Sequence, residues 1–270
     1  MNAEHHPAGL EVDGLTVRFG GHVAVNALSF TAPRGRITGL IGPNGAGKTT
    51  TFNACSGLLE PAAGRVRLDG RDITSLGPPA RARLGLGRTF QRMELFGSLT
   101  VTENIAVGRE AGLAGASALR QVFRRPGERK AVTAAVERAL AVCGIGDLAG
   151  RRADALSTGQ RRLVELARAS ACDFSLLLLD EPSSGLDHDE TAAFGAVLTG
   201  MVAERGMGLL LVEHDMALVM GICDYLYVLD FGTLIFEGPP DEVRRSDVVR
   251  AAYLGSEADS VATETEAGVR

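Results

Sequence analysis

The stretch from Gly42 to Thr50, Gly-Pro-Asn-Gly-Ala-Gly-Lys-Thr-Thr, limits the possible folds of this chain more strongly than anything else in it. It matches the pattern G-x-x-x-x-G-K-[ST] and stands between a strand expected over residues 36–41 and a helix expected over residues 48–59. Glycines let such a loop curve around a phosphate without Cβ clashes, and its N–H groups point inward at the helix N-terminus. The stretch therefore predicts the phosphate-binding loop of a nucleotide site.

The side chains of this loop suit ATP and Mg²⁺, which are the expected cofactors. Lys48 can reach the β- and γ-phosphates, and the Thr49 hydroxyl can bind the metal ion. The other candidate nucleotide contacts in the loop are Gly42, Pro43, Asn44, Gly45, Ala46, Gly47 and Thr50. A glycine-rich turn could match the pattern by chance, but the strand before it and the helix after it favour the nucleotide loop.

Two acidic residues, Asp180 and Glu181, follow the apolar run of residues 176–179. The run predicts a buried parallel strand, and ligands gather at the carboxyl ends of such strands in open α/β sheets. We expect Asp180 to hold Mg²⁺ through its water shell and Glu181 to polarise the attacking water as general base. Two adjacent acids alone would indicate a strand-ending turn; together with the phosphate-binding loop they indicate catalysis.

Strand and helix signals divide the chain into two α/β blocks with a helical stretch between them. The first block predicts strands over residues 10–19, 27–32, 36–41 and 65–68, the last followed by a tight turn at Asp69-Gly70. Helix formers dominate residues 101–172. The last block alternates strands, at residues 176–179, 208–212 and 225–229, with helices at residues 190–205 and 216–222. Because alternation predicts a parallel sheet covered by helices, the helical stretch is interpreted as an insertion.

Composition excludes several other classes of protein. The net charge of −5 argues against general nucleic-acid binding. No apolar run approaches the ~20 residues of a membrane span, and the first residues lack a secretory signal. The four cysteines are widely spaced, which predicts buried thiols rather than a disulfide framework or a metal site.

Residues 155–162, Ala-Leu-Ser-Thr-Gly-Gln-Arg-Arg, resemble the Leu-Ser-Gly-Gly-Gln signature of ABC ATPases. Here Thr158 replaces the first glycine of that signature; its backbone N–H remains available, but its Cβ limits how closely a phosphate can approach. A polar helix N-cap at Ser157 or Thr158 explains the same residues and is compatible with the signature, since a capped helix N-terminus is itself an anion site.

The resemblance to ABC ATPases implies roles for further residues. Gln91 matches the glutamine that senses Mg²⁺ and the membrane partner, and His214 matches the switch histidine that contacts the γ-phosphate. Residues 184–187 resemble the loop that connects two nucleotide sites. Phe19 stands where the family stacks an aromatic ring on adenine, although core packing explains it equally well. In the family's head-to-tail dimer, the signature residues act on the partner's nucleotide; they are Ser157, Gly159 and Gln160.

The same resemblance implies an α/β fold: a P-loop NTPase (RecA-like) core with an N-terminal antiparallel β subdomain and an inserted α-helical subdomain. We expect one domain over residues 10–255, and tails at residues 1–9 and 256–270 that are disordered because apolar residues are few. The expected core comprises residues 10–91 and 173–240, and the helical subdomain comprises residues 92–172.

Other segments resemble the branched-chain amino-acid importer ATPases, specifically the subunit with the longer helical insert. They are residues 18–21, 24–26, 88–91, 95–96, 99–104 and 252–255. The resemblance implies two transmembrane permease subunits, a second ATP-binding subunit (a sister or an identical copy), and a solute-binding protein outside the cytoplasm. The chain would lie on the cytoplasmic face of the cell membrane. A urea or amide importer and a lipopolysaccharide-type exporter remain alternatives.

Two other classes explain the motifs less completely. A soluble ABC ATPase that acts on DNA or ribosomes usually has two cassettes or a long coiled coil, and a regulatory module without turnover usually lacks the base or the switch histidine.

Residues 112–130 carry the basic side chains Arg120, Arg124, Arg125, Arg129 and Lys130. We expect either contact with the permease or the anionic membrane surface, or a solvated loop.

Overall fold

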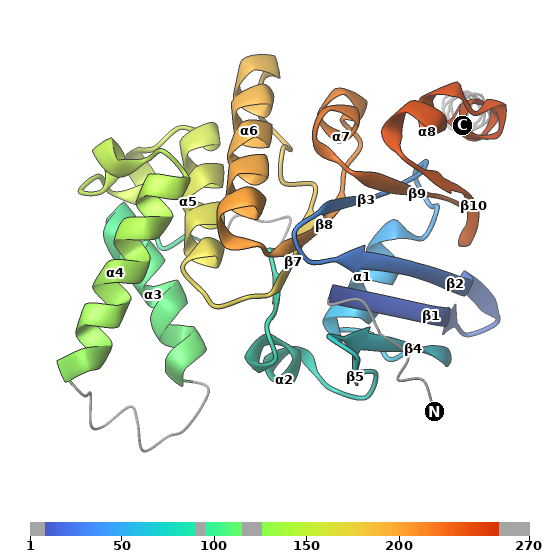
Figure 1. The fold of residues 1–270 in the computed structure, drawn as a ribbon, viewed down its shortest axis with the longest axis horizontal. Coiled ribbons are helices and arrows are strands. Elements are labelled where there is room, and N and C mark those ends of the chain that lie inside the picture. The colour runs from blue at the N-terminus through green and yellow to red at the C-terminus, as the bar shows by residue number, and fades with distance from the viewer. Residues whose placement is uncertain (1–8, 90–94, 115–125, 254–270) are drawn as a thin grey trace, which may run out of the picture.

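The computed structural model describes residues 9–89, 95–114 and 126–253, which form two sheets and the helices around them (Figure 1). The strands are β1 (Gly9–Phe19), β2 (His22–Pro33), β3 (Ile37–Ile41), β4 (Ala63–Leu68), β5 (Arg71–Asp72), β6 (Leu86–Arg88), β7 (Leu176–Asp180), β8 (Gly208–Val212), β9 (Tyr225–Asp230) and β10 (Thr233–Gly238). The helices are α1 (Lys48–Ser56), α2 (Pro78–Arg83), α3 (Val101–Ala114), α4 (Pro126–Val142), α5 (Thr158–Ser170), α6 (His188–Arg205), α7 (Met216–Ile222) and α8 (Pro240–Arg245). Short 3₁₀ turns occur at Gly146–Leu148 and Ala153–Ala155.

The smaller sheet is antiparallel, with the strand order β2-β1-β4-β5. Its last hairpin turns at Asp69 and Gly70, whose φ angles are 51° and 76°, so that Leu68 pairs with Arg71. Positive φ at both central residues is the requirement of the type I′ turn, one of the two favoured two-residue hairpin turns. The predicted antiparallel β subdomain and its tight turn are therefore confirmed.

The larger sheet has the order β10-β9-β3-β8-β7-β6, and only its β9–β10 pair is antiparallel. Strands β3, β7 and β8 are buried along their whole length, as expected for a sheet covered on both faces. Their side chains alternate between two cores. Leu178 faces the core formed with α1 and the small sheet, whereas Leu177 faces the core formed with α5, α6 and α7.

Helices α3, α4 and α5 gather at one end of the molecule, beside α6 and away from the small sheet (Figure 1). Their shared core includes Val101, Ile105, Val136 and Val164. This arrangement confirms the inserted helical subdomain as part of the fold. Among the residues that the structure describes, no helix is long and apolar enough to span a membrane.

Some boundaries differ from the sequence prediction. Helix α1 ends at Ser56 rather than at residue 59, because Gly57 adopts a φ of 80° and its N–H caps the helix. Gly9, expected in the N-terminal tail, belongs to β1. The rest of the two expected tails, residues 1–8 and 256–270, lies outside the described residues. The exact domain limits therefore remain predictions.

All four cysteines are free and buried, at positions 55, 143, 172 and 223. Burial raises the pKa of Cys55, Cys143 and Cys223 to about 12, so these thiols stay protonated at neutral pH. The expectation of buried thiols is confirmed. They are packing residues, because the thiolate is the reactive form of cysteine.

Candidate functional site

The register of the large sheet brings the predicted phosphate-binding loop, residues 42–50, and the acidic pair Asp180 and Glu181 to one edge. Val212 at the end of β8 pairs with Leu40 on one side and with Asp180 on the other. Since all three strands run in parallel, the residues that follow them leave the sheet at the same level. Gly42 and Glu181 therefore begin neighbouring loops at the carboxyl edge of the sheet, where open α/β folds bind ligands.

The backbone of the loop requires glycine at two close approaches. Gly42 has a φ of 149°, and a Cβ there would lie 2.1 Å from the carbonyl oxygen of Leu229. Gly47 has a φ of 95°, and a Cβ there would lie 2.7 Å from the carbonyl oxygen of Ala24. Helix α1 then begins at Lys48 with no side chain capping its N-terminus. Its first N–H groups thus remain suitable for an anion.

Lys48 folds back over this loop. Its Nζ donates to the carbonyl oxygens of Gly42, at 2.6 Å, and Pro43, at 2.8 Å. Burial lowers the pKa of Lys48, while the nearby carboxylates of Glu181 and Asp180 oppose that shift. The structure therefore brings the predicted lysine and the predicted acidic pair together, with the amine held by groups that a phosphate could replace.

Asp180 ends β7 with a buried carboxylate. Its Oδ2 accepts a hydrogen bond from Arg88 Nη2 at 3.1 Å, whereas within the described part of the chain its Oδ1 is buried with no hydrogen-bond partner. Burial raises the pKa of Asp180, and the Arg88 charge opposes that rise. This buried oxygen, together with the hydroxyl of the exposed residue Thr49 in the first turn of α1, fits a cation such as Mg²⁺, which prefers oxygen ligands.

Glu181 occupies a strained position immediately after the strand. Its φ of 47° lies in the left-handed region, which is uncommon for residues other than glycine. The backbone holds it there, because its N–H donates to the carbonyl oxygen of Val212 at 2.8 Å and its own carbonyl accepts from Ser184. Such strain clusters at functional sites. The backbone bonds therefore fix the position of Glu181 at the sheet edge, where the residue is half-buried.

Glu213 joins the loops that follow β7 and β8, and the sequence analysis assigned it no role. Its buried carboxylate accepts the N–H of Ser183 at 2.8 Å and the N–H of His214 at 3.2 Å. The His214 imidazole is 66% exposed, with its Nδ1 3.8 Å from Glu213 Oε2. The available signal was an acid directly after an apolar strand, the same pattern that identified Asp180.

The signature residues form the start of α5. Ser157 caps the helix in a reciprocal pair: its Oγ accepts from Gln160 N at 3.2 Å, and Gln160 Oε1 accepts from Ser157 N at 3.1 Å. Gly159 lies against α6, where a Cβ would meet Glu190 Oε1 at 2.5 Å. The N-cap interpretation is thus confirmed. Because α5 lies with the helical subdomain (Figure 1), the signature and Lys48 belong to different parts of the chain.

Of two further predicted site residues, Phe19 lies within the described residues and Gln91 does not. Phe19 ends β1 and is 50% exposed, which argues against the alternative of core packing. Gln91 lies outside the described residues, as do Arg120, Arg124 and Arg125 of the basic segment. Asn44 and Gly45, at the tip of the phosphate-binding loop, are exposed.

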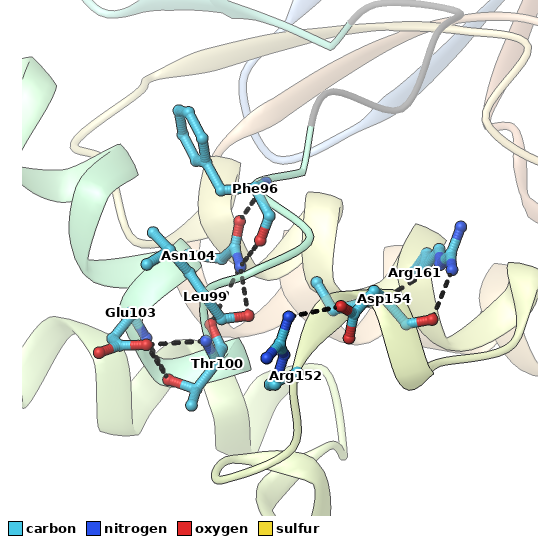
Figure 2. A network of polar contacts seen from close by, with 9 residues as sticks. Phe96, Leu99, Thr100, Glu103, Asn104, Arg152, Asp154 and Arg161 are labelled. Atoms are coloured by element: carbon cyan, nitrogen blue, oxygen red, sulfur yellow. Dashed lines mark hydrogen bonds and ion pairs between the residues drawn. The ribbon is translucent and has the colours of Figure 1, made fainter.

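A buried amide fixes the segment that leads into α3 (Figure 2). The Asn104 side chain is fully buried; its Oδ1 accepts from Phe96 N at 2.9 Å, and its Nδ2 donates to the carbonyl oxygens of Phe96, Leu99 and Thr100. Glu103 caps the same turn through Thr100. These bonds anchor the start of the helical subdomain. Sequence reasoning missed both: the partners of Asn104 match no local pattern, whereas Thr100 and Glu103 match the capping-box pattern, which could have indicated the cap.

Comparisons with known proteins agree with this geometry. The family profile described as ABC transporter matches residues 25–184, and the profile described as Branched-chain amino acid ATP-binding cassette transporter matches residues 233–259. The chain is 39% identical over 249 residues to the high-affinity branched-chain amino acid transport ATP-binding protein BraF of Pseudomonas aeruginosa, with 91% of this chain and 97% of that protein covered.

Two further similarities extend the comparison. The chain is 34% identical to the lipopolysaccharide export system ATP-binding protein LptB of Acidithiobacillus ferridurans, with 92% of this chain and 97% of that protein covered. The crystal structure of the ADP conformation of MJ1267, an ATP-binding cassette of an ABC transporter, superposes with a TM-score of 0.81 at 31% identity. That superposition covers 93% of this chain and 100% of the other.

Proposed function

Because the chain belongs to the ABC transporter ATP-binding family, whose members bind nucleotide and hydrolyse ATP to drive transport, we propose that it energises the uptake of branched-chain or other hydrophobic amino acids. The observation that carries this proposal is the similarity to BraF, which spans nearly the whole of both chains. The match of residues 233–259 to the branched-chain amino acid profile supports it independently of the ATPase motifs.

The geometry of the sheet edge suggests how the chain's own groups act. The N–H groups at the start of α1 and the Lys48 ammonium bind the phosphates, after the amine leaves the carbonyl oxygens of Gly42 and Pro43. Glu181 holds the attacking water and takes its proton, and His214 orients the same water beside the γ-phosphate.

Thr49 and Asp180 are the proposed ligands of Mg²⁺, either directly or through water, and Gln91 is proposed to complete that shell. The bound ion would supply charge neutralisation on the phosphate oxygens. The support for this assignment is the buried Asp180 Oδ1, which has no other partner among the described residues. Phe19 is proposed to stack on the adenine, and the exposure of this residue supports the proposal.

The signature residues are proposed to act on a second subunit's nucleotide in a head-to-tail dimer. The separation of α5 from the phosphate-binding loop within one chain supports this arrangement (Figure 1). We further propose two membrane-spanning permeases and an extracytoplasmic solute-binding protein as partners, and a position on the cytoplasmic face of the membrane. Similarity to BraF, a transport protein, supports these partners.

A second candidate is the ATPase of a lipopolysaccharide-type exporter. The 34% identity to LptB over nearly the whole chain favours it specifically. The two proposals share the same ATPase chemistry and differ only in the membrane partners, so the partners decide between them.

Purification of the tagged full-length chain from its native membranes, with mass spectrometry of the proteins that accompany it, tests the proposal. Two permeases together with an amino-acid-binding protein would support amino-acid import. Lipopolysaccharide-export subunits would favour the second candidate. Ribosomes, DNA-repair proteins or no membrane partner at all would overturn both uses while leaving the ATPase chemistry in place.

A further inference from the structure

Arg88, at the end of β6, spans the gap between β7 and α1. Its Nη2 donates to Asp180 Oδ2 at 3.1 Å, and its Nη1 donates to Asn53 Oδ1 at 2.7 Å and to Ser56 Oγ at 2.8 Å. One guanidinium therefore contacts both the carboxylate that ends β7 and the last turns of the helix that begins at Lys48. Neither contact is local in sequence.

The surroundings of Arg88 hold the guanidinium rigidly. The side chains of Arg88 and Asp180 are only 11% and 2% exposed, and the guanidinium carbon lies 5.9 Å from the centre of the Phe52 ring. A planar guanidinium presents its donors in a fixed fork, so three acceptors around it also fix the positions of one another. A lysine has a single point charge and cannot impose the same geometry.

The face of α1 that Arg88 contacts is the face that carries Thr49. Thr49, Asn53 and Ser56 are spaced by four and three residues, which places them on one side of the helix. Arg88 thus connects the face of α1 that carries Thr49 to the side chain of Asp180, and these two residues are the proposed metal ligands. It takes only Oδ2 of Asp180 and leaves Oδ1 unpaired within the described residues.

We propose that Arg88 is a positioning residue for the metal site: it sets the distance between Asp180 and α1 and keeps Asp180 Oδ1 turned toward the metal. This inference rests on the proposed role of Asp180 as a Mg²⁺ ligand. Replacing a residue that hydrogen-bonds to a metal ligand typically lowers the affinity for the metal about 10- to 100-fold. Arg88 touches neither nucleotide nor metal in this assignment and acts on the metal site through Asp180 and α1.

The test compares Arg88→Met with Arg67→Met in the full-length chain. Arg67 is the control, because it also forms an arginine–carboxylate ion pair, with Glu11 at 2.9 Å, but in the small sheet and somewhat more exposed. Two quantities are measured: the affinity for ADP in EDTA, and the affinity of the ADP complex for Mn²⁺, from the EPR signal of the free ion. Mn²⁺ takes the same oxygen ligands as Mg²⁺.

We expect Arg88→Met to weaken Mn²⁺ binding about 10-fold while the affinity for ADP in EDTA changes less than about twofold. Arg67→Met should change neither quantity. Unchanged Mn²⁺ affinity in Arg88→Met would overturn the inference. An equal loss of ADP affinity in EDTA would also overturn it, because it would show that Arg88 merely supports the fold of the phosphate-binding loop.

If Arg88→Met does not fold, Ser56→Ala serves instead, since it removes one of the acceptors that hold Arg88 and leaves the Asp180 contact. A fall in Mn²⁺ affinity at constant ADP affinity, smaller than the ~10-fold loss expected for Arg88→Met, supports the inference, and no fall contradicts it. Mn²⁺ binding by the wild-type chain tests the role of Asp180 as a metal ligand separately from the role of Arg88. If its ADP complex binds no Mn²⁺ at all, the role of Asp180 as a metal ligand fails, and the inference fails with it.

Discussion

Glu213 Oε1 accepts the backbone N–H of Ser183 at 2.8 Å, and this bond joins the loop after β7 to the loop after β8. The first loop begins with Glu181 and the second contains His214. Because Glu213 is only 1% exposed, the bond lies in the protein interior, where a hydrogen bond is strong and its loss is costly. The proposed base and the proposed switch histidine are thus held relative to each other by one buried carboxylate.

Replacement of Glu213 by alanine should destabilise the chain. It leaves the buried N–H of Ser183 without its acceptor, which costs about 1–3 kcal/mol in the free energy of unfolding. Urea unfolding measures the change, with Glu237→Ala as the control because Glu237 is exposed. Equal stabilities of the two variants would show that Glu213 does not fix the two loops.

Replacement of Glu181 by glutamine should abolish turnover and preserve ATP binding. The amide keeps the size of the side chain but cannot take a proton from water, so ATP should remain bound between two chains. Phosphate release measures turnover, and size-exclusion chromatography with ATP and Mg²⁺ detects the trapped dimer. Hydrolysis at the wild-type rate would refute Glu181 as the base.

The matched control for this experiment is Lys48→Ala. It removes the ammonium that lies over the phosphate-binding loop, and should therefore weaken ATP binding itself. Equilibrium binding of a fluorescent ATP analogue separates the two variants. Unchanged nucleotide affinity in Lys48→Ala would contradict the assignment of residues 42–50 as the phosphate-binding loop.

The free energy of unfolding should decrease as pH rises above about 9, because the thiols are buried. The pKa of Cys55 is about 12 in the folded chain, whereas a thiol in the unfolded chain titrates near ~8.5. Between these values the unfolded chain has lost the proton that the folded chain retains, so the free energy of unfolding decreases as pH rises. One such thiol contributes a decrease of about 1.4 kcal/mol per pH unit.

Cys55→Ala isolates this contribution. The cost of the smaller side chain is the same at every pH, but the decline of stability between about pH 9 and 10.5 should be shallower than in the wild type. Urea unfolding at several pH values measures both curves. Parallel curves would show that Cys55 ionises equally in the folded and unfolded chains, and hence that its burial is incomplete.

The sequence was sufficient for features that local patterns encode. The tight backbone of residues 42–47 follows from its glycines, and the position of Asp180 at the end of a buried strand follows from the apolar run before it. Features that depend on distant partners were missed. Strand β6 is only three residues long and exists by pairing with β7, far along the chain. The contacts of Arg88 with Asp180 and α1 follow from that pairing, so no local pattern could have indicated them.

Single residues at element boundaries were missed for a different reason. Gly57 ends α1 because it alone can adopt the left-handed cap without strain, although the residues after it are compatible with a longer helix. Glu213 carries the same signal as Asp180, an acid at the end of a buried strand. Its role depends on the Ser183 N–H in a neighbouring loop, which only the folded chain brings near.

Replacement of Gly159 by alanine separates packing from catalysis in the signature. The added Cβ would lie 2.5 Å from Glu190 Oε1 and would displace that carboxylate, whose Oε2 accepts the N–H of Asp187 in the cap of α6. The loss of this capping interaction should cost about 1 kcal/mol in the free energy of unfolding. If Gly159 also approaches a partner's nucleotide, ATP turnover should fall as well.

A double-mutant cycle with Glu190→Ala distinguishes these two effects. In the Glu190→Ala background no carboxylate remains to be displaced, so Gly159→Ala should cost less stability than in the wild type. The loss of turnover should persist there, because a Cβ at position 159 still limits how closely a phosphate can approach the start of α5. Recovery of turnover together with stability would instead show that Gly159 serves only the packing of α5 against α6.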